Sequence, residues 1–378
     1  MALIGLASLA RTAFSGGDLS PVGAELLQRA ANDPADADAL MDMSTVLQLR
    51  GNRELGLAVQ AQALAMRQVY RVGDGRGPRV LVILSAGDLA ENNVLEFLLE
   101  DSGVRLELLY VAPGVPLPAR LPEHDLVFVA VCESDRNRPL LARIRPLFSA
   151  WPRRVLNAPD RIARLSRDGA CEIIGDVPGL VLPPTVRVAR ADLCMPGEFA
   201  IIVRPVDSQK GQGLEKVADE AGVAAYLAAR PEAEFYAAPF VDYRSPDGLY
   251  RKYRIVLIEG QAFACHMAIS AHWMVHYMSA GMAESAEKRA EEARFMAEFD
   301  TGFAARHRDA LAAISTRLGL DYVGIDCGET ADGSLLLFEV DSGMTVHAMD
   351  GADLFPYKQV QMKKVFEAFR RMLGRAAA

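Results

Sequence analysis

The sequence predicts an α/β chain in which a helical N-terminal segment is followed by alternating strands and helices. Residues 1–72 carry apolar residues at helical spacing. A short apolar run rich in β-branched residues begins at 79 and is typical of a buried parallel strand, and strands then alternate with helices up to about 150. Beyond 155, proline-rich joints separate short strands, hairpins and helices. The 378 residues suffice for two or three domains.

The composition indicates a folded protein and argues against several classes of partner. Hydrophobic residues make up 51% of the chain and charged residues 24%, so it can bury an ample core. The net charge of -8 argues against nucleic acid as a partner, and no apolar run reaches the roughly 18 residues of a membrane span. The apolar start lacks a basic leading segment, and five scattered cysteines show no zinc spacing. We therefore expect a cytoplasmic protein without nucleic-acid or membrane partners, with homo-oligomerisation left open.

The first 72 residues are expected to be all-helical. Helices are predicted at 36–49 and 53–71, with Gly51 and Asn52 breaking the pattern between them. Two antiparallel helices joined by a glycine-containing turn resemble one tetratricopeptide unit. A single unit cannot bury its own core, so the pair should lie against a neighbouring domain. We favour a helical cap or dimerisation surface over peptide recognition.

The rest of the chain is expected to form a parallel-sheet domain and two lobes. Strands are predicted at 79–84, 106–111 and 126–131, with a helix from 92 to 100. No GxGxxG fingerprint is present, so a dinucleotide site is not indicated, although loops such as 132–135 follow strands where open sheets bind ligands. The predicted domains are a helical 1–72, a Rossmann-like 73–150, a small lobe 151–240 and a large lobe 241–378.

The two lobes are predicted to contain strands, hairpins and helices in a fixed order along the chain. The predicted elements are a strand at 200–204, a helix at 219–229, an apolar segment at 234–240, a hairpin of 250–258 with 261–269, helices at 283–299 and 303–318, a second hairpin at 321–341 and a terminal helix at 357–373.

The second hairpin is predicted to bring carboxylates together. Asp332-Gly333 is a strong signal for a two-residue turn, since both central positions of that turn have positive φ. If Ala331 pairs with Ser334, Asp326 lies directly opposite Glu339, at a Cβ separation of roughly 5 Å.

Asp341 lies on the same strand face as Glu339, because side chains alternate along a strand. Three neighbouring carboxylates repel one another unless a cation shares them, and hard divalent cations such as Mg²⁺ prefer oxygen ligands. The other positions of both strands are largely apolar, which a solvated acidic face would not show. The pattern therefore predicts a metal site at Asp326, Glu339 and Asp341, and phosphoryl chemistry with it.

A glycine-containing loop precedes this hairpin. Arg204 ends a predicted strand and enters a loop that holds Ser208, Lys210, Gly211 and Gly213. Glycine lets backbone N–H groups approach a polyphosphate, and the lysine adds positive charge. Taken alone, the stretch is better interpreted as an ordinary polar hairpin loop.

Basic and imidazole side chains mark two more segments. Lys252 and Arg254 share one strand face and indicate an anion site, with a solvated edge as the equal alternative. His272 and His276 are four residues apart, so a helix would place them on one face. They are candidates for substrate recognition or proton transfer, and two satisfied histidines among packed Trp, Met and Tyr are the equal alternative.

Phosphate loop, basic strand and acidic hairpin occur in the order seen in the ATP-grasp superfamily. The chain resembles its glutathione-synthetase-like and ribosomal-protein glutamate-ligase-like members over about 78–360. Segments 202–205 and 208–214 are similar to the phosphate strand and glycine loop of that family, and 236–242 is similar to its interlobe hinge. Residues 339–343 are similar to the Glu-x-Asn-x-x metal motif, with Asp326 as the upstream acid.

The resemblance implies an ATP-grasp fold preceded by a parallel-sheet domain and a small N-terminal helical domain. It implies ATP and two Mg²⁺ ions, replaceable by Mn²⁺, as cofactors, and Arg254 and Lys210 as catalytic residues. The nucleotide-binding residues that it implies are Arg167, Arg204, Ser208, Lys210, Gly211, Gly213, Ala238, Phe240 and Asp242. Substrate-contacting candidates are Lys252, His266, His272, His276 and His347.

The implied reaction is ATP-dependent ligation of a carboxylate to an amine through an acyl phosphate, on small molecules or peptides. Three departures from the family are visible: Arg204 and Arg167 replace lysines, Asp341 replaces an asparagine, and 265–270 lacks the usual arginine. Because that acyl-handling arginine is missing, a carboxylate kinase or phosphotransferase is an alternative. A non-catalytic nucleotide-sensing interaction protein is the third hypothesis.

Overall fold

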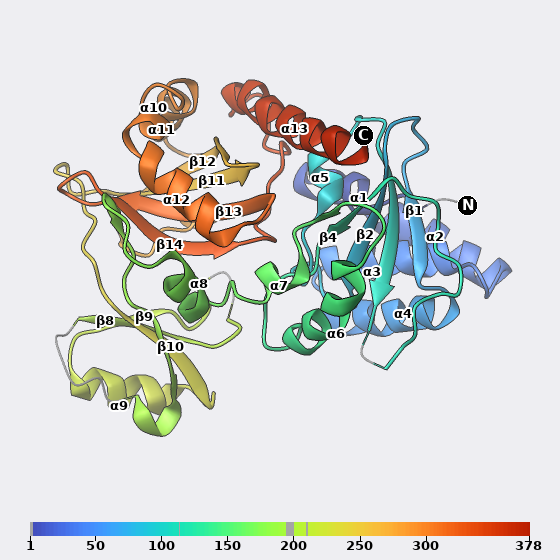
Figure 1. The fold of residues 1–378 in the computed structure, drawn as a ribbon, viewed down its shortest axis with the longest axis horizontal. Coiled ribbons are helices and arrows are strands. Elements are labelled where there is room, and N and C mark those ends of the chain that lie inside the picture. The colour runs from blue at the N-terminus through green and yellow to red at the C-terminus, as the bar shows by residue number, and fades with distance from the viewer. Residues whose placement is uncertain (1–2, 113, 194–199, 209–210) are drawn as a thin grey trace. The chain divides into compact units, whose positions relative to one another are not determined.

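The computed structural model describes residues 3–112, 114–193, 200–208 and 211–378. The chain forms two compact units. The first comprises Met1–Ala163, Leu320–Val323 and Ser342–Ala378, and the second comprises Arg164–Gly319 and Gly324–Asp341. The fold is a mixed α/β fold with several sheets and flanking helices, as predicted (Figure 1). The division into four domains stays a prediction.

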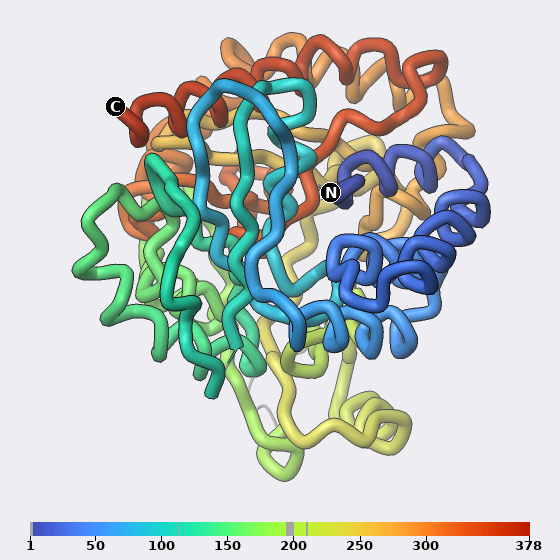
Figure 2. Tube along the Cα trace, turned by 90° about the vertical axis from the view of Figure 1, so that its right-hand side faces the viewer, coloured from blue at the N-terminus to red at the C-terminus, as the bar shows by residue number. Residues whose placement is uncertain are grey.

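The N-terminal helices of the first unit share one small core. They are α1 (Leu6–Phe14), α2 (Ser20–Asn32), α3 (Ala37–Leu49) and α4 (Arg53–Met66). Figure 2 shows them in blue, gathered as one group. Leu9, Leu26 and Val46 form the centre of their core and are almost completely buried. Asp36 caps α3, since its side chain accepts a hydrogen bond from the Ala39 N–H at 2.9 Å.

Two carboxylates hold the start of α1. Asp42 accepts hydrogen bonds from the N–H groups of Ile4 (2.8 Å) and Gly5 (3.2 Å), and Glu96 accepts one from the Ala7 N–H (3.0 Å). Burial raises the pKa of Asp42 to about 6 and that of Glu96 to about 7, because the charged form loses its hydration.

A five-stranded sheet forms the body of the first unit. Its strand order is β1-β3-β2-β4-β5, and all neighbours are parallel except β1 and β3. The strands are β1 (Val69–Val72), β2 (Arg79–Ser85), β3 (Arg105–Val111), β4 (Leu126–Val129) and β5 (Val155–Leu156). The helices of this part are α5 (Leu95–Leu98), α6 (Arg138–Ser149), α7 (Pro159–Ile162) and α13 (Pro356–Ala377).

The prediction that residues 1–72 are all-helical is wrong at their end. The α4 helix stops at Met66, and Val69–Val72 pairs antiparallel with β3 as an edge strand. Tyr70 is 1% exposed, and its hydroxyl donates to the Ala63 carbonyl. The β-branched and aromatic residues of this stretch favour a strand once a neighbouring strand edge is available.

The last helix of the chain completes the core of this sheet. Phe369 of α13 is fully buried, with its ring centroid 5.7 Å from that of Phe128 on β4 and 5.4 Å from that of Tyr322. Residues from three distant parts of the sequence therefore form one aromatic cluster.

Asn157 joins two distant segments of the first unit. Its side-chain amide donates to the Tyr322 carbonyl (2.8 Å) and accepts from the Tyr322 N–H (2.9 Å), as a neighbouring strand would. Its own N–H donates to Asp321 at 2.9 Å. Asn157 is 0% exposed and has a φ of 51°, in the left-handed region that asparagine tolerates better than most residues.

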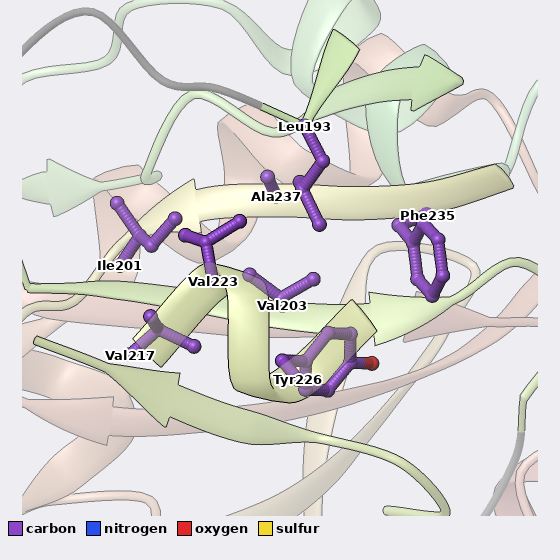
Figure 3. Packing of buried hydrophobic residues seen from close by; sticks show 8 residues of the cluster. All are labelled: Leu193, Ile201, Val203, Val217, Val223, Tyr226, Phe235 and Ala237. Carbon is purple, nitrogen blue, oxygen red and sulfur yellow. The ribbon is translucent and has the colours of Figure 1, made fainter. Parts of the chain in front are cut away.

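The second unit contains a small antiparallel sheet of order β7-β10-β8-β9. Its strands are β7 (Val186–Ala189), β8 (Ile201–Pro205), β9 (Glu215–Val217) and β10 (Glu234–Pro239), and α9 (Glu220–Ala229) covers it. Figure 3 shows how Val223 and Tyr226 of α9 lie against Val203 and Phe235 of the sheet. This packing fixes the position of β8, whose last two residues are Arg204 and Pro205.

A larger sheet of order β12-β11-β13-β14-β6 forms the rest of the second unit. Its strands are β6 (Leu180–Val181), β11 (Tyr250–Ile258), β12 (Gln261–Ser270), β13 (Tyr322–Glu329) and β14 (Leu335–Asp341). The helices α10 (Ala286–Ala297), α11 (Phe303–Arg306) and α12 (Arg308–Leu318) accompany it (Figure 1). Helix α8 (Arg167–Ile174) contacts both β14 and β7 and so links the two sheets. None of the described helices is long and apolar enough to cross a membrane.

We predict that Asn157→Ala destabilises the protein by about 2–4 kcal/mol, measured by chemical denaturation. The substitution leaves a buried N–H and a buried carbonyl of Tyr322 without partners and places alanine at a positive φ that asparagine tolerates better. Asn52→Ala, at an exposed asparagine whose side chain makes no capping hydrogen bond, is the control and should change stability by less than about 0.5 kcal/mol. Equal effects of the two substitutions would contradict the bridging role.

We also predict a pH-dependent effect of Glu96→Gln. Glutamine keeps an acceptor oxygen for the Ala7 N–H but cannot ionise. Because folding raises the pKa of Glu96 to about 7, its stabilising contribution is complete below about pH 4.5 and is lost as the pH rises through 7. The free energy of unfolding of the variant should therefore gain about 3 kcal/mol on the wild type between pH 4.5 and 7.5, because the pKa rises from 4.5 to about 7 on folding. Parallel curves, as expected for the exposed control Glu25→Gln, would contradict this.

Candidate functional site

The acidic hairpin has the predicted register, but for a reason that the sequence does not reveal. Asp326 on β13 lies opposite Glu339 on β14, as predicted, and Asp341 lies opposite Gly324. The predicted two-residue turn is wrong, because Thr330 pairs with Ser334 and only Gly333 has positive φ. The longer turn shifts the register by one residue.

A β-bulge after Asp326 corrects this shift. Cys327 pairs with Leu337, so Phe338 is the extra residue on β14. The turn and the bulge each displace the pairing by one residue, in opposite directions. Asp326 and Glu339 therefore come to lie on one face of the hairpin.

Asp326 is paired with the basic strand face. Its Oδ2 accepts a hydrogen bond from Lys252 Nζ at 2.8 Å, and its Oδ1 accepts one from Arg254 Nε at 2.8 Å. The Asp326 side chain is 4% exposed. Burial alone would raise the pKa of Asp326, but the charges and hydrogen bonds of Arg254 and Lys252 outweigh it and hold the pKa well below its usual range. The equal alternative of a solvated strand edge for Lys252 and Arg254 is therefore wrong.

Glu339 has a different partner. Arg167, at the first position of α8, forms an ion pair with Glu339 and donates a hydrogen bond to the Phe338 carbonyl at 3.4 Å. Ser166 caps α8 by accepting from the Gly169 N–H and thereby fixes the start of the helix. A predicted phosphate ligand and a predicted metal ligand are thus in direct contact.

The carboxylates do not form a shared metal site in this arrangement. Both oxygens of Asp326 are bonded to cations, and Glu339 is bonded to Arg167. Among the described residues, no group of three or more His, Cys, Asp or Glu side chains is placed to hold one ion. As arranged, Asp326, Glu339 and Asp341 do not fit a divalent ion held by all three, and their role as ligands stays a prediction.

Arg204 organises the start of the glycine loop. Its Nε donates to Ser208 Oγ at 3.0 Å, another of its nitrogens donates to the Ser208 carbonyl, and Ser208 Oγ donates to the Pro205 carbonyl at 2.6 Å. Arg204 is 8% exposed. Burial and the neighbouring charge of Arg167 lower the pKa of Arg204 to about 10. Lys210, the predicted catalytic lysine, lies outside the described residues.

The second unit encloses a cavity of about 180 Å³. Arg167, Arg204 and Lys252 line it as cations, with Asp326 and Glu339 as acids. Most of the other lining side chains are apolar. They come from the predicted hinge and from β14, and include Tyr236, Ala238, Phe240, Leu336 and Phe338. Such a mixture of an apolar wall and a few convergent charged groups is typical of a small-molecule site.

The predicted hinge and loop residues occupy different places around the cavity. Ala238, Phe240 and Gly211 line it. Asp242 is exposed and accepts a hydrogen bond from the Arg244 N–H at 3.1 Å. The Gly213 carbonyl accepts from Tyr226 at 2.7 Å, and a Cβ at this position would lie 2.7 Å from the Pro205 ring. Glycine at 213 is therefore required by packing.

The predicted histidines separate in the structure. The segment 271–276 is not helical, so His272 and His276 do not share a helix face as predicted. His276 lines the cavity, whereas His272 is exposed. His266 lies opposite Arg254 on β12, with its ring 4.6 Å from that of Tyr277. His347 belongs to the first unit, where its ring contacts Phe14 and Phe97.

Sequence reasoning missed the apolar lining of the cavity. Trp273, Met274 and Val275 line it beside the hinge, and Trp273 contacts Phe240 with ring centroids 5.5 Å apart. Leu165 and Cys171 contribute from the segment around α8. The wholly apolar strand face of 335–340 was the sequence signal for this lining. Isolated aromatic and sulfur side chains in loops show no periodicity from which a cavity wall could be predicted.

No protein-family model and no curated protein sequence matches the chain. Among solved structures, it is similar to the VanG D-Ala:D-Ser ligase from Enterococcus faecalis, at 14% identity and a TM-score of 0.47, over 79% of this chain and 100% of that one. It is similar to a RimK domain protein, ATP-grasp, from Sphaerobacter thermophilus, at 16% identity and a TM-score of 0.46, over 78% and 99% of the two chains.

A third similar structure is the D-cycloserine synthetase DcsG, at 15% identity and a TM-score of 0.45, over 78% of this chain and 99% of that one. Because all three TM-scores lie below 0.5, the function proposed below is based on the geometry of the chain itself.

We predict that Asp326→Asn destabilises the protein by about 3–5 kcal/mol at neutral pH, because it leaves Lys252 and Arg254 without their buried counter-charge. Chemical denaturation measures the effect, and Asp300→Asn, at an exposed aspartate, is the control. Folding lowers the pKa of Asp326, so its contribution is present above the usual aspartate range and is lost as the pH falls below it. A variant as stable as the wild type at pH 7 would show that the ion pairs are not structural.

Proposed function

We propose that the chain is an ATP-dependent carboxylate–amine ligase that acts through an acyl phosphate. One observation carries the proposal: a single cavity combines an apolar wall from the hinge and β14 with three lining cations, Arg167, Arg204 and Lys252. A purine ring suits the apolar wall, and a polyphosphate suits guanidinium and ammonium groups. The sequence order of these elements is the order that first indicated the ATP-grasp resemblance.

The electrostatics of the cavity support an anionic ligand. Arg204 is buried beside a second guanidinium, and its lowered pKa reflects both effects. Asp326 neutralises part of the charge of Lys252 and Arg254, and Glu339 neutralises part of that of Arg167. A bound polyphosphate would relieve the remaining repulsion among the cations and would order the glycine loop through Arg204 and Ser208.

In the proposed reaction, an oxygen of the substrate carboxylate attacks the γ-phosphorus of ATP. A new oxygen–phosphorus bond forms, the bond to the β-phosphate oxygen breaks, and ADP leaves. The nitrogen of an amine then attacks the acyl carbon, the bond from that carbon to the phosphate oxygen breaks, and inorganic phosphate leaves. The cations of the cavity would stabilise the charge that moves in both steps.

Individual residues receive roles within this proposal. Arg204, Ser208 and Gly211 would hold the phosphates, and Ala238 and Phe240 would face the base. Arg254, oriented by Asp326, would polarise the acyl group. The roles of Asp242 at the ribose and Lys210 at the phosphates stay predictions. A requirement for Mg²⁺ or Mn²⁺ also stays a prediction, and no step is assigned to a metal ion.

The proposal is tested by measuring ADP release from ATP with the twenty amino acids as carboxylates, each with and without hydroxylamine as a small trapping nucleophile. A ligase should form ADP and an acyl hydroxamate together, and the same acids with an amine partner should give amide and inorganic phosphate. A stable acyl phosphate that no amine consumes would select the kinase alternative. Binding of ATP that raises the melting temperature, with no turnover for any acid, would select the nucleotide-sensing alternative.

We predict that Glu339→Gln lowers turnover by about 10²–10³-fold and changes the melting temperature little. Glu339 lines the cavity and holds Arg167, but its side chain is 36% exposed, so few buried contacts depend on its charge. Steady-state ADP release measures turnover. Glu234→Gln, at an exposed glutamate paired with Arg187 on the small sheet, is the matched control and should leave turnover unchanged. Similar rates for the two variants would remove Glu339 from the site.

A further inference from the structure

The segment 271–277 is fastened at two points beside the cavity. The Tyr243 hydroxyl donates a hydrogen bond to the Trp273 carbonyl. The Tyr277 hydroxyl donates to Glu292 Oε2 at 3.0 Å, and Glu292, which is 0% exposed, also accepts from the Met267 N–H at 3.0 Å. His276 lies between these two anchors, so its position is set by the fold.

The imidazole of His276 lies directly against the glycine loop. A Cβ built on Gly211 would be 2.4 Å from His276 Nε2, and Gly211 has a φ of 71°. Glycine at 211 therefore satisfies both the backbone conformation and the close approach of the ring. His276 shares the lining of the cavity with Arg204, Lys252 and Asp326. The ring thus borders both the proposed phosphate loop and the charged groups.

The ring of His276 is available for proton transfer. Within the described part of the chain, neither ring nitrogen makes a hydrogen bond. The charged groups that face it are Lys252 and Arg254 on β11, Asp326 on β13 and Arg204 on β8. Burial and the charge of Lys252 lower the pKa of His276, with Asp326 opposing them, so the ring is neutral at pH 7.

We propose that His276 is the proton acceptor for the amine in the second half of the reaction. The inference rests on the proposed ligase function. His276 takes a proton from the ammonium form of the amine, and the neutral nitrogen then attacks the acyl carbon. The nitrogen–carbon bond forms, the carbon–oxygen bond to phosphate breaks, and the second proton of the nitrogen leaves with the phosphate. The ring then returns its proton to solvent. An amine that has lost its proton is a competent nucleophile, so the residue acts on the step that defines a ligase.

The other two predicted histidines of the second unit do not meet these conditions. His272 is exposed, and its backbone N–H is bonded to Ser270 Oγ at 3.0 Å. His266 contacts the ring of Tyr277 on β12. His276 is therefore selected from the predicted group by its place in the cavity wall and its contact with Gly211.

The test compares two nucleophiles in the full-length protein. The acid is the one that best supports hydroxamate formation in the amino-acid survey, and the amines are the same twenty amino acids. Hydroxylamine is largely unprotonated at neutral pH and needs no base to become a nucleophile, whereas amino-acid amines arrive protonated and must first lose a proton. His276→Gln should lower amide formation by about 10²–10³-fold and hydroxamate formation by less than about threefold. The wild-type rate of amide formation should fall at low pH with the titration of one group, and the variant should lose this dependence.

Met278→Gln is the matched control, because it introduces the same residue two positions further on, at a side chain that is 96% exposed. It should leave both rates unchanged, and melting curves should show that both variants are folded. Equal loss of amide and hydroxamate in His276→Gln would mean that His276 only shapes the glycine loop, which overturns the proposal. Wild-type hydroxamate formation without amide from any amine would overturn it too. Failure of the wild type to form either product would overturn the ligase function itself.

Discussion

The pairing of Asp326 with Lys252 and Arg254 is the interaction on which the site depends. It joins the neighbouring strands β11 and β13 through their side chains, and it places a negative charge where two cations would otherwise be buried without compensation. Neither cation could stay on this face without the acid, and the acid could not stay ionised at 4% exposure without the cations. The charge pattern of the cavity follows from this one cluster.

The same cluster also affects the balance of positive and negative charge around the cavity. Asp326 is bonded to two cations and Glu339 is paired with Arg167. Arg204, by contrast, donates to the neutral hydroxyl and carbonyl of Ser208. Burial and the charge of Arg167 lower the pKa of Arg204, and the charge of Glu339 opposes them only in part. Binding of an anion is therefore more favourable here than at a site whose charges are already balanced, because the anion supplies the negative charge that the cations still lack.

Elements with a long periodic pattern could be predicted from the sequence. A register that depends on two local features together could not. The hairpin of β11 and β12 and the helix α13 follow from periodicity and are close to prediction. Asp326 lies opposite Glu339 only because a three-residue turn and a bulge at Phe338 cancel, and neither has a sequence signal strong enough to be predicted. Val69–Val72 became a strand because β3 offers an edge, which is a tertiary effect. The contact of His276 with Gly211 joins residues 65 positions apart, and no periodicity links them.

The first unit is built from segments that lie far apart in the sequence, and this affects when its core can form during synthesis. Phe128 on β4 lies far earlier in the sequence than its aromatic neighbour Phe369, so the two rings can meet only after Phe369 has been made. A ribosome releases residues in order, so the core of the sheet of β1 to β5 is not closed until α13 has been made. During that interval the apolar surface around Phe128 and Leu126 is uncovered.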